Sequence, residues 1–600
     1  MAKTEKIPDR SSVKTKDAWD LAQLYKSDAA WERAFKKVAS QIGEFQRFRG
    51  TLGESPTALK ACLEFDTEFD HAGEKLGSYA FLKASQDVSN SAYQGMVARF
   101  TRVATEAGEA ASFIAPEIQS IPKKKLERFV RSATLKDYRF NLEKLMRYKR
   151  HILSAKEERV LAMQGEITGT ASRVFSQLTD ADFSFGFVKD ERGTKVELTQ
   201  SSLGVLTRSQ KRSVRREAFT KFYKVYDNHK NTLGASLNGS VLQDIYHARV
   251  RNHPSARESA LFSDKVPVSV YDSLIEAVHD NLDTVYRYIE LRRKALRVKE
   301  LRAYDNNVPL VDPGRVKISY AEAVDMVCEA VRPLGAEYGR TLRKGLNGRW
   351  VDRYENRGKR SGAFSAGGYE GPPYILMNYK EGTLDSAFTL AHEAGHSMHT
   401  YYSARNQTYQ NYQYTIFVAE VASTFNEELL NHYLLERATT KKRRAYLINR
   451  EIDQIRGTII RQTMFAEYEK IIHAIAEAGE PLTVERLRAE YLELIKLYFG
   501  PKFVIDDVLS LEGMRIPHFY HAFYVYKYAT GLSAAISLAK GVLNGGKKEL
   551  NAYLGFLKCG GSKFPLDLLR GAGVDLEKPE PVQDAMDHLR NLVDELETLL

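Results

Sequence analysis

Cysteine is scarce and long apolar stretches are missing from this sequence of 600 residues. Its 3 cysteines, Cys62, Cys328 and Cys559, lie far apart and form no C-x-x-C pair. An odd number of distant cysteines excludes a disulfide framework and favours a reducing compartment. No run of about 18 apolar residues offers a membrane span, and the charged N-terminus lacks the apolar core of a secretory signal. We therefore expect a cytoplasmic protein without a membrane partner.

Internal repeats, low-complexity tracts and clusters of basic residues are also missing. The chain has 88 Lys and Arg against 77 Asp and Glu, a net charge of +11, which would suit an anionic partner. The basic residues are dispersed, however, and the tightest run, 441–444, begins a helical pattern. Nucleic-acid surfaces gather their basic residues on one face, so we expect no nucleic-acid partner. A basic nucleic-acid-binding protein with a structural metal stays as the alternative of a different class.

Helical periodicity is the main pattern that is present. Apolar residues recur at helical spacing over 16–50, 55–84, 87–117, 120–180 and 205–300. Around 181–200 the sequence alternates apolar and polar residues about Glu191-Arg192-Gly193, which predicts a short hairpin. With 43% hydrophobic residues the chain can bury a large core. The pattern predicts a mainly α fold.

The stretch 383–403 carries His392-Glu393-Ala394-Gly395-His396, an H-E-x-x-H sequence in a predicted helix with Thr383 as its cap. Residues four apart share a helix face, so both imidazoles reach one ion while Glu393 leans toward a water on that ion. Gly395 leaves room for another segment to approach the metal face. The alternative is a pair of buried core histidines.

A second predicted helix, 415–430, offers the third ligand that a catalytic zinc needs. Glu420 stands in an apolar run, where an acid is costly to bury unless it is paired or coordinated. Ser423 and Glu427 follow on the same face, and Glu427 is expected to orient a ligand histidine through its distal nitrogen. We expect one zinc ion per chain, bound by His392, His396 and Glu420. The alternatives are a solvated helix residue for Glu420 and a surface carboxylate for Glu427.

Glycine is dense in 346–382, where two extended pieces, 350–356 and 373–379, predict a small sheet just before the metal helix. We expect the strand that begins at Tyr374 to be exposed and to pair with the main chain of a peptide substrate. Gly367 and Gly368 would allow a mobile lid or a close approach of substrate. A surface hairpin without function is the alternative.

Tyrosines are dense in 511–535, after His518. A histidine or a tyrosine hydroxyl can stabilise the negative charge that develops on a carbonyl oxygen during amide hydrolysis. Tyr524 and Tyr528 would share a helix face and are the candidates for this role with His518, while Tyr520 is a candidate substrate contact. Tyr526 points elsewhere and is assigned to packing. Each tyrosine taken singly is also compatible with the core.

These segments together resemble oligoendopeptidase F, in the thimet oligopeptidase family of zinc metallopeptidases. The resemblance is carried by GAFSAGGYEGPPYILMNY, FTLAHEAGHSMH, FVAEVASTFNEELL, RGTIIRQTMFAEYE and RIPHFYHAFYVYKYATGLSAA. It implies that His392, His396 and Glu420 bind zinc, that Glu393 is the catalytic carboxylate, and that residues of 518–528 contact substrate. The sequence departs from the family at Phe364, where similar proteins often have tyrosine.

The resemblance further implies an elongated, multi-helix body with a deep substrate channel that admits short unfolded peptides. The expected parts are an N-terminal helical region, 1–200, and a catalytic domain, 201–600. The expected activity is zinc-dependent endopeptidase cleavage of internal peptide bonds, with Glu393 as the general base. A zinc carboxypeptidase of similar fold is the alternative, and it would need a clamp for the free C-terminus.

Overall fold

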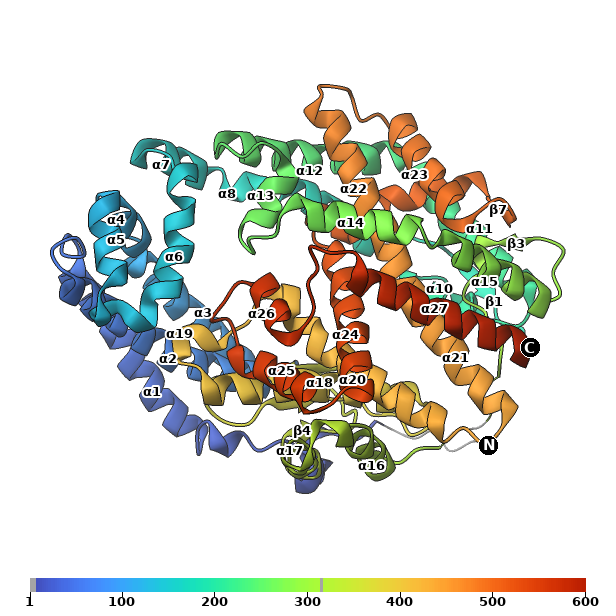
Figure 1. The fold of residues 1–600 in the computed structure, drawn as a ribbon, viewed down its shortest axis with the longest axis horizontal. Coiled ribbons are helices and arrows are strands. Elements are labelled where there is room, and N and C mark those ends of the chain that lie inside the picture. The colour runs from blue at the N-terminus through green and yellow to red at the C-terminus, as the bar shows by residue number, and fades with distance from the viewer. Residues whose placement is uncertain (1–6, 313, 315–316) are drawn as a thin grey trace. The chain divides into compact units, whose positions relative to one another are not determined.

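A computed structural model describes residues 7–312, 314 and 317–600 of the chain (Figure 1). These residues form two compact units, and each unit is assembled from separate stretches of sequence. The first contains 7–150, 317–433 and 538–573, and the second contains 151–312, 314, 434–537 and 574–600. The sequence predicts an N-terminal helical region, 1–200, and a catalytic domain, 201–600. These two parts are defined by their expected roles, and the division stays a prediction.

The first unit is built mainly of helices. They are α1 (Asp28–Gln41), α2 (Pro56–Gln86), α3 (Ser91–Ala111), α4 (Ile114–Ser120), α5 (Lys123–Arg131), α6 (Arg139–Arg147), α16 (Tyr320–Ala330), α17 (Ala336–Asn347), α18 (Asp385–Asn406), α19 (Tyr409–Tyr412), α20 (Ile416–Glu436), α24 (Tyr526–Asn544), α25 (Lys547–Cys559) and α26 (Pro565–Ala572). α20 ends in residues of the second unit, and α24 begins there, since its residues 526–537 belong to the second unit and only 538–544 to the first.

The second unit is helical as well. Its helices are α7 (Ala155–Met163), α8 (Gly165–Thr168), α9 (Thr170–Ser176), α10 (Gln200–Leu206), α11 (Arg212–Asn228), α12 (Lys230–Val250), α13 (Ala256–Phe262), α14 (Val268–His279), α15 (Leu282–Ala295), α21 (Lys441–Ile455), α22 (Arg461–Glu477), α23 (Val484–Phe499) and α27 (Glu580–Leu599). The predicted mainly α class is therefore confirmed. No helix in the described part of the chain has both the length and the apolar character that a membrane crossing needs.

Two small sheets belong to the second unit. β1 (Phe187–Lys189) and β2 (Lys195–Glu197) form an antiparallel hairpin, as predicted for 181–200. Gly193 in its turn has a φ of +82°, which glycine adopts without steric cost. β3 (Leu301–Arg302) pairs in parallel with β7 (Phe503–Val504).

A three-stranded sheet precedes α18 in the first unit, where the glycine-rich stretch predicts one. Its strands, β4 (Val351–Asp352), β5 (Phe364–Ala366) and β6 (Tyr374–Leu376), lie in the order β4-β6-β5. β6 is central and wholly buried, because β4 pairs with one of its edges and β5 with the other. The prediction that the strand at Tyr374 is exposed for substrate pairing is therefore wrong. β5 forms the edge of the sheet instead.

The central helix of the first unit is α18, which packs against α16, α17, α25 and strands β5 and β6 (Figure 1). It begins at Asp385 with Leu384 at the N-cap, one residue later than predicted. The predicted cap, Thr383, lies one position outside, where its hydroxyl accepts a hydrogen bond from the Asp385 N–H. Most of α18 is buried, as expected for a helix that is enclosed by neighbours.

α20 crosses α18 at Gly395, and the two backbones touch there. A Cβ placed on Gly395 would lie 2.6 Å from the Cα of Ser423 and would also overlap the carbonyl of Ala422. The expectation that glycine lets another segment approach this face is confirmed. No other residue type fits this crossing without moving one of the helices.

The imidazole of His399 is fully buried on α18, with 0% of its surface exposed. It stacks on Tyr414 with 3.6 Å between ring centroids and lies 5.1 Å from the ring of Phe556 on α25. Neither ring nitrogen has a hydrogen-bond partner among the described residues. Burial, together with the charge of His396, lowers the pKa of His399 to about 3. The ring is therefore neutral and acts as an aromatic core residue.

Replacing Gly395 by alanine should lower the free energy of unfolding by about 1–3 kcal/mol, because the new methyl group overpacks the α18–α20 crossing. Urea denaturation measures this change. Gly339→Ala on α17 is the matched control, since its Cβ meets nothing within 4 Å. The control should be neutral or stabilising by up to about 1 kcal/mol. Equal effects of the two substitutions would contradict the close crossing.

His399→Phe should make stability less sensitive to acid. The unfolded chain, with a histidine pKa near 6.5, binds a proton at pH values where folded His399, with a pKa of about 3, does not. Stability present above about pH 6.5 is therefore lost as the pH falls, by about 2 kcal/mol at about pH 5. Urea denaturation at about pH 7.5 and about pH 5 measures the free energy of unfolding at each pH. We expect the variant to lose less of this free energy between the two pH values than the unaltered protein does. An unchanged difference would contradict the buried neutral ring.

Candidate functional site

α18 presents His392 and His396 side by side at the wall of a cavity in the first unit. The two Nε2 atoms are 3.2 Å apart, as expected for histidines one turn apart on a helix. The cavity has a volume of about 560 Å³. Both imidazoles therefore direct a nitrogen toward the same point.

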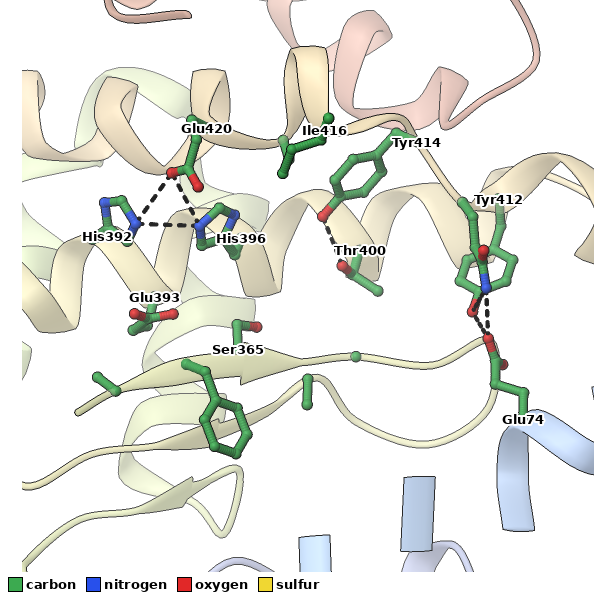
Figure 2. Close-up of a pocket in the computed structure, with 16 residues that line it drawn as sticks. Glu74, Ser365, His392, Glu393, His396, Thr400, Tyr412, Tyr414, Ile416 and Glu420 are labelled. Atoms are coloured by element: carbon green, nitrogen blue, oxygen red, sulfur yellow. Dashed lines mark hydrogen bonds and ion pairs between the residues drawn. The ribbon is translucent and has the colours of Figure 1, made fainter. Parts of the chain in front are cut away.

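α20 adds a carboxylate to this pair. Oε2 of Glu420 lies 3.3 Å from Nε2 of His392 and 3.4 Å from Nε2 of His396, so the three donor atoms form a nearly equilateral triangle (Figure 2). All three residues are suited to hold a metal ion. The crossing at Gly395 is what allows Glu420 to approach α18 this closely. The structure thus brings together the three residues that the sequence singles out as ligands.

Two neighbours on α20 support the triangle. Oε1 of Glu427 lies 2.6 Å from Nδ1 of His392, which leaves Nε2 of that ring to face the cavity. The buried hydroxyl of Ser423 donates to Oε2 of Glu420 at 2.9 Å. These contacts match the predicted supporting positions of both residues. Held in this way, the imidazole and the carboxylate have little freedom to rotate away.

The triangle is electrostatically coupled. Burial disfavours the charged form of His392, but hydrogen bonds to Glu420 and Glu427 outweigh it and raise the pKa of His392 to about 10. Burial also opposes the charge on Glu420, yet hydrogen bonds from the two histidines hold its pKa well below the ordinary value. In the absence of a cation the two carboxylates therefore favour a proton on His392, and a metal ion would displace it, because metal ligands must be deprotonated.

Glu393 is a buried carboxylate in the same cavity, with 6% of its surface exposed. Burial raises its pKa, while the positive charges of His392 and His396 and a hydrogen bond from the Ser365 backbone oppose the rise. Figure 2 shows Glu393 on the side of α18 that faces β5, next to Ser365. An acid with a raised pKa beside a potential metal site is suited to proton transfer.

The edge strand β5 forms the opposite wall of the cavity. Phe364, Ser365 and Ala366 line it, together with Gly367. The hydroxyl of Ser365 is 2.8 Å from that of Ser397, which fixes the strand against α18. On the side away from β6, β5 pairs with no other strand of the described chain. Its free edge therefore lies in the cavity.

Gly367 and Gly368 were predicted as substrate or lid residues, and the space beside each is occupied by protein. A Cβ on Gly367 would lie 2.5 Å from the Thr400 side chain, and one on Gly368 would lie 3.3 Å from Oε2 of Glu74. Both glycines therefore allow the loop after β5 to pack closely against α18 and α2. Of the two, Gly367 lines the cavity.

Tyr374 does not reach the cavity. Its side chain is 1% exposed, and its hydroxyl donates to the carbonyl oxygen of Asp20. It belongs to the hydrophobic core that α1 to α6 form with the sheet. This burial contradicts the predicted substrate contact of Tyr374.

The predicted His518 segment belongs to the second unit. Its 3-10 helix, η12 (Pro517–Tyr520), is short, and α24 starts only at Tyr526, so Tyr524 precedes α24. The rings of His518, Tyr524 and Tyr528 nevertheless cluster, with centroids 5.4 to 6.0 Å apart. Burial, together with His521, lowers the pKa of His518 and favours its neutral form.

The other two tyrosines of this segment have different surroundings. Tyr520 packs against Phe175 with 4.6 Å between the centroids of the tilted rings, and it lines a cavity of the second unit. Burial raises its pKa to about 12. Tyr526 is 1% exposed and packs against Tyr271, which confirms its assignment to packing.

Several residues of the cavity were missed by sequence reasoning. Thr400 and Tyr414 share a hydrogen bond of 2.9 Å, and Tyr412 and Glu74 face each other farther along (Figure 2). The tyrosine-rich stretch 409–414 follows the metal helix directly and could have been recognised. Glu74 lies more than three hundred positions from the motif on α2, and no local pattern indicates it.

Comparison with known proteins agrees with this site. A model of peptidase family M3 matches residues 205–588, and a model of oligopeptidase F matches residues 117–185. The chain is 43% identical over 599 residues to oligopeptidase PepF of Bacillus subtilis (strain 168), which covers 100% of this chain and 89% of that protein.

Solved structures give the same result. A structure from Chlamydophila abortus matches 99% of this chain and 100% of its own, with a TM-score of 0.94 and 34% identity. Oligoendopeptidase-F from Enterococcus faecium matches 95% of this chain and 99% of its own, with a TM-score of 0.74 and 34% identity. The chain therefore belongs to peptidase family M3, with the oligoendopeptidase F proteins, and is a peptidase.

Proposed function

We propose that this peptidase is a zinc-dependent endopeptidase that cuts internal bonds of short unfolded peptides, with one zinc ion held by His392, His396 and Glu420. The observation that carries the proposal is the spacing of their donor atoms, 3.2, 3.3 and 3.4 Å. Tetrahedral zinc with bonds of about 2.0–2.1 Å separates neighbouring donors by about 3.3 Å. Two imidazoles and a carboxylate are also a ligand set of catalytic zinc, which keeps one position open.

Glu393 is the proposed general base. A bound zinc ion supplies a Lewis acid that polarises a carbonyl oxygen and lowers the pKa of water toward about 7. The Glu393 carboxylate takes a proton from the attacking water and then returns it to the leaving amine. Its burial supports this role, because a raised pKa brings the carboxylate closer to the working pH.

The free edge of β5 is the proposed binding surface for the substrate main chain. A peptide that adds to an exposed sheet edge gains backbone hydrogen bonds whatever its side chains are. β5 offers such an edge in the cavity that contains Glu393. We assign to β5 the pairing role that the sequence suggested for the next strand.

His518, Tyr524 and Tyr528 are the proposed hydrogen-bond donors to the carbonyl oxygen on which negative charge develops. Their clustered rings support a shared role. A neutral imidazole and tyrosine hydroxyls are suitable donors for such an oxygen. Tyr520 stays a proposed substrate contact.

Peptides blocked at both ends should be cut at internal bonds, because an endopeptidase needs no free terminus. Mass spectrometry of the products, with and without a chelator, makes this measurement. Cleavage should stop on chelation and return with added zinc. Glu393→Gln is the matched control, which should keep its zinc but lose about 10²–10⁴-fold in kcat. Trimming restricted to unblocked C-termini would favour a carboxypeptidase, and an active Glu393→Gln variant would remove Glu393 from the proposed role.

Glu427→Gln should weaken zinc binding by about 10–100-fold, because it removes the charged partner that orients His392. Competition with a chromophoric chelator measures the affinity. Glu420→Ala removes a ligand and should weaken binding more strongly than Glu427→Gln. Glu370→Gln, at a carboxylate that pairs with His71 and Lys75, is the control and should bind zinc normally. Unchanged zinc affinity in the Glu420 variant would contradict the ligand assignment.

A further inference from the structure

Glu74 is a carboxylate without a cationic partner in the catalytic cavity. It lies on α2 and lines the same cavity as His392, Glu393 and His396. Its Oε1 accepts hydrogen bonds from the Tyr412 hydroxyl and, at 3.1 Å, from the Gln413 amide, while Oε2 accepts from the Tyr369 N–H at 2.9 Å. All three donors are neutral. Within the described ranges, no lysine, arginine or histidine forms an ion pair with Glu74.

The nearest basic residues of α2 are already engaged elsewhere. His71 lies 3.1 Å from one oxygen of Glu370, and Lys75 pairs with the other. Burial raises the pKa of Glu74, although its hydrogen bonds and the charge of His71 oppose the rise. A positively charged partner stabilises the ionised form of a half-buried carboxylate, and the described part of the protein supplies no such partner for Glu74. The open side of Glu74 is the cavity.

The position of Glu74 relative to the catalytic residues follows from the chain after β5. Ser365 contacts Ser397 and Glu393, Gly367 packs on Thr400, and the Tyr369 N–H reaches Glu74. The four residue steps from Ser365 to Tyr369 span at most about 13 Å, because β5 itself ends at Ala366. Figure 2 shows the same order, with the metal-site residues at one end, Thr400 and Tyr414 between, and Tyr412 and Glu74 at the other end.

We propose that Glu74 binds a cationic group of the substrate, above all its terminal α-ammonium, roughly three to four residues before the scissile bond. The inference rests on the proposed endopeptidase function and deepens it. A substrate strand antiparallel to β5 places its earlier residues beside the later residues of β5, and so beside Glu74. A parallel strand would place the terminal carboxylate there, where two negative charges repel each other. The charge of Glu74 therefore selects the antiparallel direction.

The test uses a series of peptides with one cleavage sequence and two to six residues before the scissile bond. Each peptide is made with a free and with an acetylated N-terminus, and kcat/KM is measured at about pH 7. A free amine at the matching length should raise kcat/KM by about 10-fold to 100-fold over the acetylated peptide, as expected for a hydrogen bond between charged groups. In Glu74→Gln this ratio should fall to about 1, while kcat/KM for the acetylated peptide stays unchanged.

Two further peptides distinguish the terminal α-ammonium from the side-chain ammonium of lysine as the bound cation. Acetylated peptides with lysine or norleucine at the matching position test a side-chain ammonium. The advantage of a free α-ammonium should disappear above about pH 8, whereas that of lysine should persist to about pH 10. An advantage restricted to lysine would overturn the assignment to the chain terminus.

Glu370→Gln is the matched control, because this acid lies in the loop that contacts Glu74 but pairs with His71 and Lys75. It should keep the full ratio between free and acetylated peptides. A ratio near 1 at every length in the unaltered enzyme, or a ratio that survives Glu74→Gln, would overturn the proposal. Equal losses on both peptides in Glu74→Gln would assign Glu74 to loop structure alone and would also overturn it.

A binding measurement keeps this test separate from the proposed function. Calorimetry with Glu393→Gln should show tighter binding of the free peptide at the matching length, and the preference should be absent in the double variant with Glu74→Gln. If the enzyme cuts no peptide, the proposed function fails, while this binding preference still supports or overturns the role of Glu74.

Discussion

The site depends on the backbone contact between α18 and α20. His392 and His396 need only their own helix to share a face, but Glu420 comes from a second helix and must approach within 3.4 Å of both. That approach requires the two helices to touch where Ala422 and Ser423 pass Gly395. A side chain at this point would separate the axes and move the carboxylate outward. A residue without a side chain therefore determines whether the three donor atoms can meet.

The charges of the site are expensive to bury, and the structure offsets this cost locally. Glu420 receives hydrogen bonds from both histidines and Ser423, and His392 is held by Glu427 on its far side. Each contact reduces the rotation of a donor before any cation arrives. The same contacts stabilise a proton on His392, so a metal ion has to displace that proton in order to bind. The hydrogen bonds that hold the donor atoms in place are therefore also the ones that favour a proton in competition with a metal ion.

Local patterns predicted much of the fold and of the site. The H-E-x-x-H spacing, the acid at 420 and the turn at Gly193 depend on a few neighbouring residues, and the structure brings them to the expected places. The order of strands in a sheet depends on distant partners, and period-two alternation cannot identify which strand is central. For that reason the pattern predicts an exposed strand at Tyr374, which is buried. Glu74 escapes local patterns for another reason, because it comes from a helix distant in sequence from the other cavity residues.

A cavity wall made of an edge strand has a consequence for selectivity. In the proposed binding mode, backbone hydrogen bonds along β5 stabilise any bound extended peptide to the same extent. They give affinity without distinguishing one side chain from another. Discrimination between peptides must then come from groups that contact side chains or chain termini. Glu74 provides a charge beyond the end of that strand, where its carboxylate accepts a hydrogen bond from the Tyr369 N–H. In the role proposed above, its negative charge favours a peptide whose free N-terminal ammonium lies beside it, and the position of the cut along the peptide then matters more than the sequence around it.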